Sequence, residues 1–457
     1  MVMASLRPVP SSYRDPAGFV VNDSGIFKRV VTSRGIKDYR EFINSGLYED
    51  LVSYGLLVSH YEERPANSAL GELLLVPEQI PFISYPFEWS FDQLRDAALV
   101  TLKIQQRALE RGFMLKDASA YNVQFLASRP VFIDTLSFTR YEGGPWPAYE
   151  QFCRHFLGPL LLMRYRAPDA ARFLKVELDG FSLERVSRAL PLGSWLNGGA
   201  LLHIHLHARA LRRNPQAGGE PPGGNAHLPQ LIASLRRTIE KIPRPEPQGA
   251  WTSYYSEWRF YSPAARESKR EAVQELVYRV KPSLVYDLGA NTGLYTREAA
   301  AYGALCIAFD KDAACVNRLY LEERAKPDSR ILPLVMDLEN PSPPLGFELG
   351  ATMSLLERPQ ADLVMCLGLL HHLRVSGNLP LARIANFLAR LGRKLLIEFI
   401  PPSDPAIKAL TRRSDFDDFN AAGFLEAFSS RFRLEAIRPL AASERVLYLF
   451  ERLPCST

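Results

Sequence analysis

The chain is poor in cysteine. Only five of its 457 residues are cysteines, and no two of them form a CxxC pair. A structural zinc cluster or a framework of disulfide bonds needs closely spaced or paired cysteines. The sequence therefore predicts neither, and its few scattered thiols are typical of a protein of the reducing cytoplasm.

The sequence also lacks a long apolar segment and a long run of charge of one sign. Its most apolar stretch, Phe156–Met163, is far shorter than the about 20 residues that cross a bilayer. The first residues contain no apolar core of a signal peptide. The net charge of +5 is spread along the chain, so charge alone does not predict nucleic-acid binding. We expect a cytoplasmic protein without a membrane span.

A segment rich in proline and glycine divides the chain. Asn214–Asn225 contains no large apolar residue, so this segment cannot bury surface and is typical of a linker. We predict a first domain over residues 1–213, a linker over residues 214–228 and a second domain over residues 229–457. These lengths agree with the usual size of about 100–200 residues for one domain.

Short apolar runs alternate with helical stretches in the second domain. Helices are predicted over Thr296–Tyr302, Ala313–Arg324 and Leu379–Leu391. Strands are predicted over Leu284–Leu288, Leu305–Phe309, Ile331–Met336, Ala361–Leu367 and Lys394–Ile400, with Arg445–Glu451 as a late edge strand. This alternation predicts an α/β fold in which a doubly wound, Rossmann-like parallel sheet has helices on both faces.

A glycine loop follows the first predicted strand. The loop Asp287–Gly293 leaves this strand and opens a helix, and open α/β sheets bind ligands at the carboxyl ends of their strands. Gly289 permits a tight turn, and Gly293 lets the backbone approach a ligand closely. Asn291 interrupts the GxGxxG pattern of dinucleotide-binding sheets, so another ligand is expected.

Acidic residues end the next two predicted strands. Asp310 follows the second strand and Asp337 the third. The two oxygens of a carboxylate can accept both hydroxyl groups of a ribose, which suits Asp310, and Asp337 can accept the amino group of adenine. The fourth strand leads into His371 and His372 and is expected to face the same crevice.

This ordered set resembles the motifs of class I S-adenosylmethionine-dependent methyltransferases. More narrowly, it resembles a bacterial group related to nodulation-associated methyltransferases, on the loop after Asp287, the two strand-end acids, Asp362–Leu373 and Leu396–Asp404. The resemblance implies S-adenosylmethionine as the cofactor. The cofactor-binding residues that we expect are Asp287, Gly289, Ala290, Asn291, Gly293, Asp310, Lys311, Asp337, Leu338, Leu367 and Tyr255.

Two histidines and one glutamate are candidates for acid–base chemistry. A methyl transfer needs an acceptor aligned behind the methyl carbon and, for many acceptors, a base. His371 or His372 can be that base, because an imidazole titrates near pH ~6.5; alternatively, one packs and the other orients the substrate loop. Glu398, at the end of the fifth predicted strand, is the competing candidate.

The first domain contains a second pattern. Asp117, Asn122 and Asp134 follow a predicted helix over Leu94–Arg111 and resemble the catalytic and metal-binding loops of kinase-fold phosphotransferases. Such chemistry needs one carboxylate near the acceptor hydroxyl, with an amide and a second carboxylate holding magnesium. The resemblance implies an α+β kinase-like domain that could bind ATP and Mg²⁺.

This pattern departs from the kinase family at several positions. Leu115 stands where a histidine is usual, Thr135 and Leu136 replace a glycine motif, and no glycine-rich phosphate loop is evident. Lys28 is a candidate for the lysine that contacts the phosphates of ATP, but no motif surrounds it. We therefore predict an inactive domain that binds or presents substrate. Active phosphotransfer, or turn-capping residues without chemistry, are the alternatives.

No metal ion is expected. His203 and His207 lie four residues apart, which suits one helical face, but no acidic partner accompanies them.

The leading interpretation is an enzyme that methylates an oxygen of a small molecule or sugar-containing metabolite. The alternatives are a bifunctional kinase–methyltransferase acting on a glycan or metabolite, and a non-catalytic scaffold. A nucleic-acid substrate is disfavoured, and the sequence indicates no oligomeric state.

Overall fold

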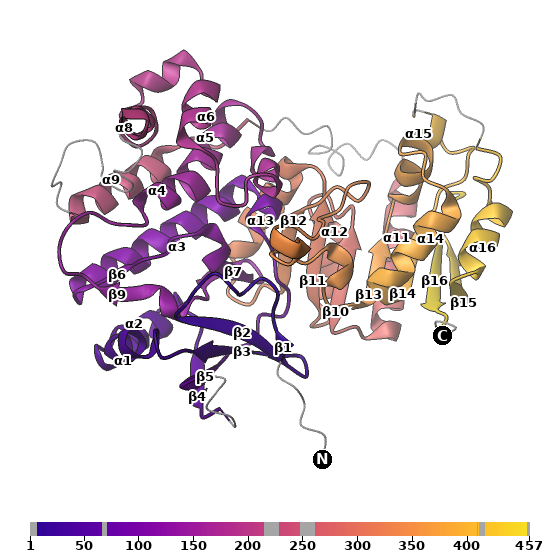
Figure 1. Ribbon diagram of the computed structural model, residues 1–457. Helices are drawn as coiled ribbons and strands as arrows, with labels where there is room; N and C mark the ends of the chain where they lie inside the picture. The colour runs from indigo at the N-terminus through magenta and orange to yellow at the C-terminus, as the bar shows by residue number, and fades with distance from the viewer. Residues whose placement is uncertain are drawn as a thin grey trace. The chain divides into compact units, whose positions relative to one another are not determined.

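The computed structural model describes residues 7–65, 71–213, 228–246, 261–408, 410 and 416–454. The chain forms two compact units (Figure 1). The first unit comprises Met1–Glu246 together with Pro344–Thr352, and the second comprises Pro247–Pro343 and Met353–Thr457. Among the described residues, no helix has the length and apolar character needed to cross a membrane.

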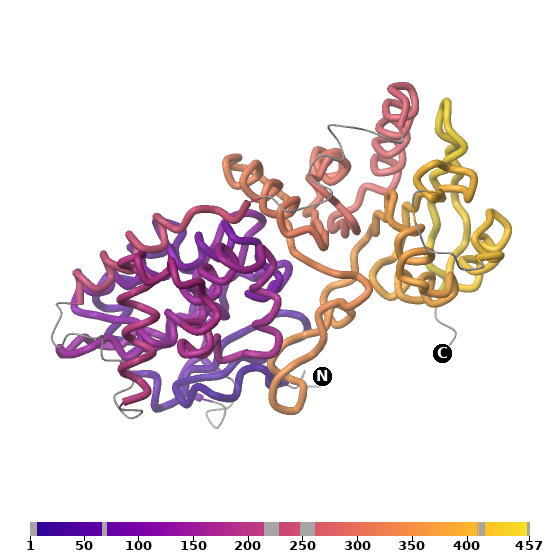
Figure 2. The backbone as a smooth tube through the Cα atoms, turned by 90° about the horizontal axis from the view of Figure 1, so that it is seen from above, coloured from indigo at the N-terminus to yellow at the C-terminus, as the bar shows by residue number. Residues whose placement is uncertain are grey.

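The first unit begins with an antiparallel sheet and continues as a mostly helical region (Figure 1 and Figure 2). The order of the strands in the sheet is β1-β2-β3-β5-β4. Their bounds are β1 Arg7–Pro8, β2 Gly18–Asp23, β3 Ile26–Val31, β4 His60–Glu63 and β5 Leu73–Pro77. Between β3 and β4 lie two helices, α1 Ile36–Asn44 and α2 Leu47–Ser53.

The helical region starts with the long helix α3, Phe91–Glu110, which a capping box between Ser90 and Gln93 initiates. Two short hairpin-like pairs follow, β6 Phe113–Leu115 with β9 Phe138–Arg140, and β7 Val123–Leu126 with β8 Arg129–Phe132. The remaining helices are α4 Tyr149–Phe152, α5 Gly158–Tyr165, α6 Leu183–Ala189, α7 Gly198–Ala200, α8 His207–Arg213 and α9 Leu228–Lys241.

Helix α9 places the domain boundary later than we predicted. We assigned residues from 229 onward to the second domain, but α9 packs against α3 of the first unit. Its Leu231, Leu235 and Ile239 are buried, and Arg244 beyond it pairs with Asp92 of α3 at 2.7 Å. An amphipathic helix must bury its apolar face, and α9 does so on the unit that precedes the proline- and glycine-rich segment.

The second unit contains a seven-stranded sheet with the order β12-β11-β10-β13-β14-β16-β15. The first five strands in this order are parallel, and β16 and β15 are antiparallel. The strand bounds are β10 Leu284–Leu288, β11 Leu305–Asp310, β12 Ile331–Val335, β13 Ala361–Cys366, β14 Gly392–Phe399, β15 Phe432–Pro439 and β16 Val446–Arg452. The predicted α/β class is confirmed.

Helices connect the parallel strands of this sheet (Figure 1). The connecting helices are α12 Leu294–Ala300, α13 Ala313–Arg324 and α14 Leu381–Leu391, whereas α11 Pro263–Val280 precedes β10, and α15 Pro405–Lys408 and α16 Ala421–Ser429 lie between β14 and β15. Residues of α11 and α12 share one buried core with β10, β11 and β13. From β10 the successive strands β11 and β12 lie on one side, and β13 and β14 lie on the other. Ligands bind at such a switch point in open α/β sheets.

One strand prediction was wrong. We expected residues 445–451 as the edge strand, but β16 lies inside the sheet, between β14 and β15. The edge is β15, whose sequence mixes apolar with charged side chains. Four of its eight residues are exposed. Such a mixed pattern suits an edge strand with one solvated face and gives little signal in the sequence.

The described cysteines are free and buried. Cys153 lies in the first unit, and Cys306, Cys315 and Cys366 lie in the second. Burial raises the pKa of each of these four thiols above its usual range. Cys455 lies outside the described residues.

Candidate functional site

The glycine loop after β10 is tied to the neighbouring strand. The backbone N–H groups of Gly289 and Ala290 both donate to the carbonyl of Phe309, at 2.9 and 3.0 Å. Gly289 and Gly293 have φ angles of 76° and 79°, a region that favours glycine. A Cβ atom on Gly293 would lie 2.5 Å from the Cδ1 atom of Leu319. The loop therefore needs glycine both for its backbone conformation and for its packing.

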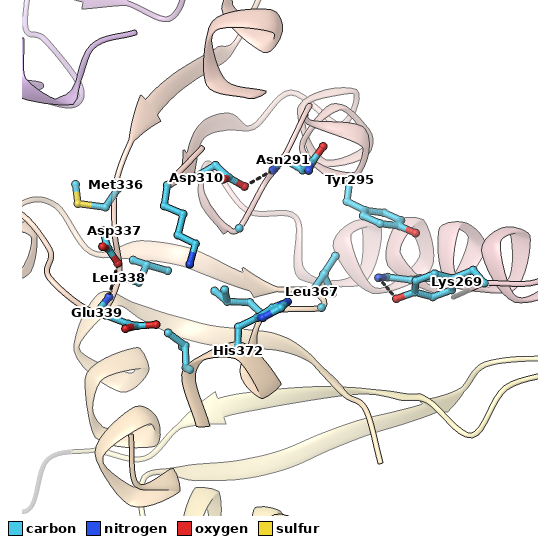
Figure 3. A pocket seen from close by; sticks show the side chains of 16 residues that line it. Lys269, Asn291, Tyr295, Asp310, Met336, Asp337, Leu338, Glu339, Leu367 and His372 are labelled. Atoms are coloured by element: carbon cyan, nitrogen blue, oxygen red, sulfur yellow. Dashed lines mark hydrogen bonds between the residues drawn. The ribbon is translucent and has the colours of Figure 1, made fainter. Parts of the chain in front are cut away.

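A pocket lies at the carboxyl ends of β10, β11, β12 and β13 (Figure 3). Four of these strand ends contribute to it, and α11 and α12 contribute side chains. The lining residues are Tyr261, Lys269, Gly289, Asn291, Tyr295, Asp310, Lys311, Met336, Asp337, Leu338, Glu339, Leu367, Gly368, Leu369, His372 and Leu373.

Most residues that the sequence predicted for the cofactor line this pocket. They are Gly289, Asn291, Asp310, Lys311, Asp337, Leu338 and Leu367, and the candidate base His372 joins them. The other predicted residues, Asp287, Ala290, Gly293, His371 and Glu398, do not line it. All five are buried. Tyr255 lies outside the described residues.

Asp310 is held firmly at the end of β11. One carboxylate oxygen accepts the backbone N–H of Asn291 at 2.7 Å, as the dashed line in Figure 3 marks, and the other accepts that of Asp312 at 2.8 Å. Burial raises the pKa of the Asp310 carboxyl, and these two hydrogen bonds oppose that effect. A carboxylate has about four acceptor sites, so the side chain retains capacity for hydroxyl groups in the pocket.

Asp337 follows β12 and sits between apolar residues. A carboxylate oxygen of Asp337 accepts the backbone N–H of Glu339 at 3.1 Å, which orients the side chain. Met336 and Leu338 flank it on the pocket wall (Figure 3). An acceptor beside two apolar side chains suits a flat ring that carries an amino group.

Asp287 lies behind the loop and does not line the pocket. The hydroxyl of Thr296 donates to its carboxylate at 2.5 Å. Burial raises the pKa of Asp287 to about 6, and the nearby Asp310 adds to this effect. Among the described residues, neither Asp287 nor Asp310 forms an ion pair. The pocket therefore has negative charge beneath it that no described cation neutralises by direct contact.

The two histidines lie in contact at the end of β13, with their rings tilted by 38°. Their ring centroids lie 4.1 Å apart, and only His372 lines the pocket. Burial lowers the pKa of His372 to about 4 and that of His371 well below its usual range. Both rings are therefore neutral at pH 7, so each has an unprotonated nitrogen, and the lowered pKa makes each a weaker base than an ordinary imidazole. Nδ1 of His371 has no hydrogen-bond partner in the described part of the chain.

Glu398 belongs to a buried charged network. Its carboxylate accepts a hydrogen bond from the ammonium of Lys269 at 2.8 Å and another from the hydroxyl of Tyr261 at 2.8 Å. Lys269 also donates to the Tyr261 oxygen at 3.0 Å. The guanidinium of Arg445 lies over the Tyr261 ring at 4.0 Å and binds Asp404. Tyr261 and Lys269 present this network to the pocket.

Sequence reasoning identified Glu398 but assigned no role to its partners Lys269 and Tyr261. Lys269 is 129 positions away from Glu398 in the chain, and nothing in its helix marks it as buried. Tyr295, whose ring lies 4.6 Å from the Lys269 ammonium, was missed for the same reason.

The structure also brings together Asp117, Asn122 and Asp134 of the first unit. The Asn122 amide donates to the hydroxyl of Ser137 at 3.5 Å, and that hydroxyl donates to Asp134 at 2.6 Å. Burial raises the pKa of Asp117, and the charge of Asp134 contributes to this shift. Lys28, the candidate phosphate lysine, instead pairs with Asp23 and Glu63.

Comparison with known proteins gave one relative of full length. Nodulation protein NoeA of Rhizobium meliloti (strain 1021) is 31% identical over 476 aligned residues, which cover 99% of this chain and 98% of that protein. No protein-family model matches the chain.

Two solved structures resemble part of the fold. The magnesium protoporphyrin IX methyltransferase ChlM from Synechocystis PCC 6803, with bound SAM, shares 17% identity with this chain. The match covers 44% of this chain and 93% of that one, with a TM-score of 0.31. The bifunctional kinase-methyltransferase WbdD shares 19% identity over 41% of this chain and 39% of that one, with a TM-score of 0.30.

Proposed function

The chain belongs to the family of nodulation protein NoeA, and on that premise we propose that its second unit is an S-adenosylmethionine-dependent methyltransferase. One observation carries the proposal. Asp310 and Asp337 follow neighbouring strands of a doubly wound sheet and line one pocket with the glycine loop of Gly289. Nucleoside ligands bind at this edge of such sheets.

The lining residues fit the cofactor group by group. Asp310 would accept the ribose hydroxyls, while Asp337 would accept the amino group of adenine. Met336, Leu338 and Leu367 would contact the faces of the purine. Asp287 and Asp310 form no direct ion pair among the described residues, and Lys269 and Lys311 offset their charges only at longer range. These carboxylates would attract a positively charged ligand, because opposite charges interact strongly where water is excluded.

The residues around the acceptor have separate tasks. S-adenosylmethionine supplies a methyl group on a positively charged sulfur, which is a good leaving group. His372, neutral and on the pocket wall, would accept the proton of the methyl acceptor, and His371 would hold its ring from behind. Glu398 is already bound to Lys269 and Tyr261, so we assign it to positioning Tyr261 rather than to proton transfer.

We assign an oxygen of a small molecule or sugar-containing metabolite as the acceptor and the cytoplasm as the location. The first unit would aid substrate binding. These assignments rest on the sequence resemblance, on the mixed polar and apolar lining of the pocket and on the few cysteines. Titration with S-adenosylmethionine and S-adenosylhomocysteine, followed by a transfer assay, tests them in order.

The binding test compares Asp310→Asn with Asp328→Asn by calorimetry on the full chain. Asp310→Asn removes a charge-assisted acceptor worth about 1.5–3 kcal/mol, so the Kd for S-adenosylmethionine should rise about 10–100-fold. Asp328 is exposed in the turn before β12, and its variant should bind like the wild type. Equal affinity of the Asp310 variant, or no binding by the wild-type chain, would refute the proposed site.

The transfer test uses methyl-labelled S-adenosylmethionine and a small-molecule extract of cells that lack this gene. The wild-type chain should label a component of the extract. His372→Gln should label it about 10²–10⁴-fold more slowly, with cofactor affinity unchanged. Binding without any transfer would favour the scaffold alternative, and a variant with wild-type rate would remove His372 from the mechanism.

A further inference from the structure

The first unit contains a cation held between carboxylates. Arg29 lies on β3, and its guanidinium binds Asp15 at 3.1 Å and Asp134 at 3.0 Å. The Arg29 side chain is 16% exposed and that of Asp134 is 11% exposed. Lys28, one position earlier, pairs with Asp23 and Glu63 instead, because successive side chains of a strand point to opposite faces.

One of the two carboxylates bound to Arg29 is Asp134, the expected metal ligand of the kinase-like pattern. Burial is the main cause that raises the pKa of Asp117, and the charges of Asp134 and Asp15 raise it further. The Asn122 amide joins the cluster through Ser137. Direct contacts join Arg29 to two acids, Asp15 and Asp134. Among the described residues, no group of three or more acids, histidines or cysteines is arranged to hold a metal ion.

Asp134 has few free acceptor positions. Its Oδ1 atom is bound by Arg29 and accepts the backbone N–H of Leu136 at 3.0 Å. Its Oδ2 atom accepts the hydroxyl of Ser137 at 2.6 Å. Magnesium demands near-octahedral geometry with oxygen ligands at about 2.1 Å, and a guanidinium in direct contact with the same carboxylate repels a second cation. These residues do not fit a resident magnesium ion.

Arg29 also fixes a loop. Asp15 lies between β1 and β2, and its carboxylate accepts the backbone N–H of Ala17 at 2.9 Å. Through Asp15 and Asp134, Arg29 joins this loop to the turn after β8. We propose that Arg29 is a built-in counter-ion that replaces a divalent metal in the first unit, so that this unit folds and works without magnesium. This inference is independent of the proposed methyl transfer.

Removal of the internal cation should create a metal site. Calorimetry with MgCl₂ and CaCl₂, and luminescence with Tb³⁺, compare the full-length wild type with Arg29→Met. The wild type should bind none of these ions in the first unit, whereas Arg29→Met should bind them with a Kd of roughly 10⁻⁴–10⁻³ M, typical of weak carboxylate sites. The double variant Arg29→Met with Asp134→Asn should lose this gain.

Arg40→Met is the matched control. Arg40 forms a more exposed ion pair with Glu62 at 2.8 Å, so its removal frees a carboxylate without assembling a cluster. This variant should gain no metal affinity. Tight binding of magnesium or Mg-ATP by the first unit of the wild-type protein would overturn the proposal. So would a folded Arg29→Met variant that binds no metal.

A stability measurement covers the case in which Arg29→Met does not fold. Thermal unfolding should then show that the double variant with Asp134→Asn folds at a higher midpoint than Arg29→Met alone, because removal of both charges leaves fewer unpaired groups. Millimolar magnesium should raise the midpoint of Arg29→Met and leave that of the wild type unchanged. A double variant no more stable than Arg29→Met would contradict the counter-ion role.

Discussion

The two units treat their buried acids in opposite ways. In the second unit, Asp310 lines the pocket and Asp287 lies behind the glycine loop, both without an ion pair among the described residues, and burial raises the pKa of both. In the first unit, Asp134 and Asp15 are bound by Arg29. Asp287 and Asp310 of the second unit are thus available to a positively charged ligand, whereas Asp15 and Asp134 of the first unit already bind a cation of the same chain.

The comparison shows that a fold can lower the stability of its ligand-free state and thereby increase its affinity for a ligand. A buried carboxylate without a counter-ion destabilises the ligand-free protein, and a cationic ligand recovers that free energy when it binds. A carboxylate with an internal cation stabilises its own unit and has less to offer a ligand. Glu398 shows that the second unit also contains the paired arrangement, since Lys269 neutralises it.

The largest effect should come from breaking the paired arrangement in the second unit. Lys269→Met leaves the fully buried Glu398 with a more distant cation, Arg445 at 4.0 Å, and should cost about 3–5 kcal/mol of unfolding free energy. Arg270→Met, on the same helix, removes an exposed pair with Glu267. It should cost far less than Lys269→Met, because an exposed ion pair contributes little to stability. Urea unfolding of both variants measures the difference, and equal losses would contradict it.

An intermediate loss is expected for Asp134→Asn in the first unit. The substitution leaves Arg29 with only Asp15 and should destabilise this unit by about 1–3 kcal/mol. Hydrogen exchange followed by mass spectrometry assigns the loss to peptides of β3 and β8. Asp23→Asn is the control, because Lys28 retains Glu63. A stabilised Asp134 variant would remove the contrast between the units.

A gain is expected for Asp287→Asn. The folded pKa of Asp287 is raised to about 6, above the usual value near ~3.9. The folded state therefore binds more protons than the unfolded state, and the stability contribution of this group falls as pH rises from about 4 to 6. Above pH 6, Asp287→Asn should be roughly 1–2 kcal/mol more stable without ligand. A destabilised variant throughout this range would show that the Thr296 hydrogen bond outweighs burial.

The smallest effect concerns pH and ligand charge. A positive ligand favours ionised Asp287, so the affinity for S-adenosylmethionine should fall about 3–10-fold as pH decreases from 7 to 5. S-adenosylhomocysteine lacks the sulfonium charge, and its affinity should change less. Calorimetry at several pH values measures both slopes, and Asp287→Asn should bring them closer together. Identical slopes in the wild type would separate Asp287 from charge recognition.

Most of the second unit was predictable because its signals are local. Parallel strands buried on both faces have continuous apolar sequences, and the predicted helix over Ala313–Arg324 has the same bounds in the structure. Asp310 and Asp337 were predictable for the same reason, since a strand end marks each of them. The mixed pattern of β15 hid the true edge of the sheet.

Partners from distant parts of the chain were not predictable. The contacts of Glu398 with Lys269 and of Asp134 with Arg29 depend on which side chain of each element faces inward. In β3, a shift of one position decides whether a basic residue reaches Asp134 or Glu63, because strand side chains alternate. We considered Lys28 as the phosphate lysine of the first unit. Because strand side chains alternate, its neighbour Arg29 contacts Asp134 instead.

The buried cysteines allow local unfolding of each unit to be measured by alkylation of the native thiols. Alkylating reagents attack the thiolate, so a thiol that is both shielded and protonated reacts only when the surrounding structure opens. Cys153 and the group of Cys306, Cys315 and Cys366 belong to different units. The rates at which the four are alkylated would therefore time the local unfolding of each unit separately, with no engineered probe, and would register a bound ligand as slower labelling in one unit alone.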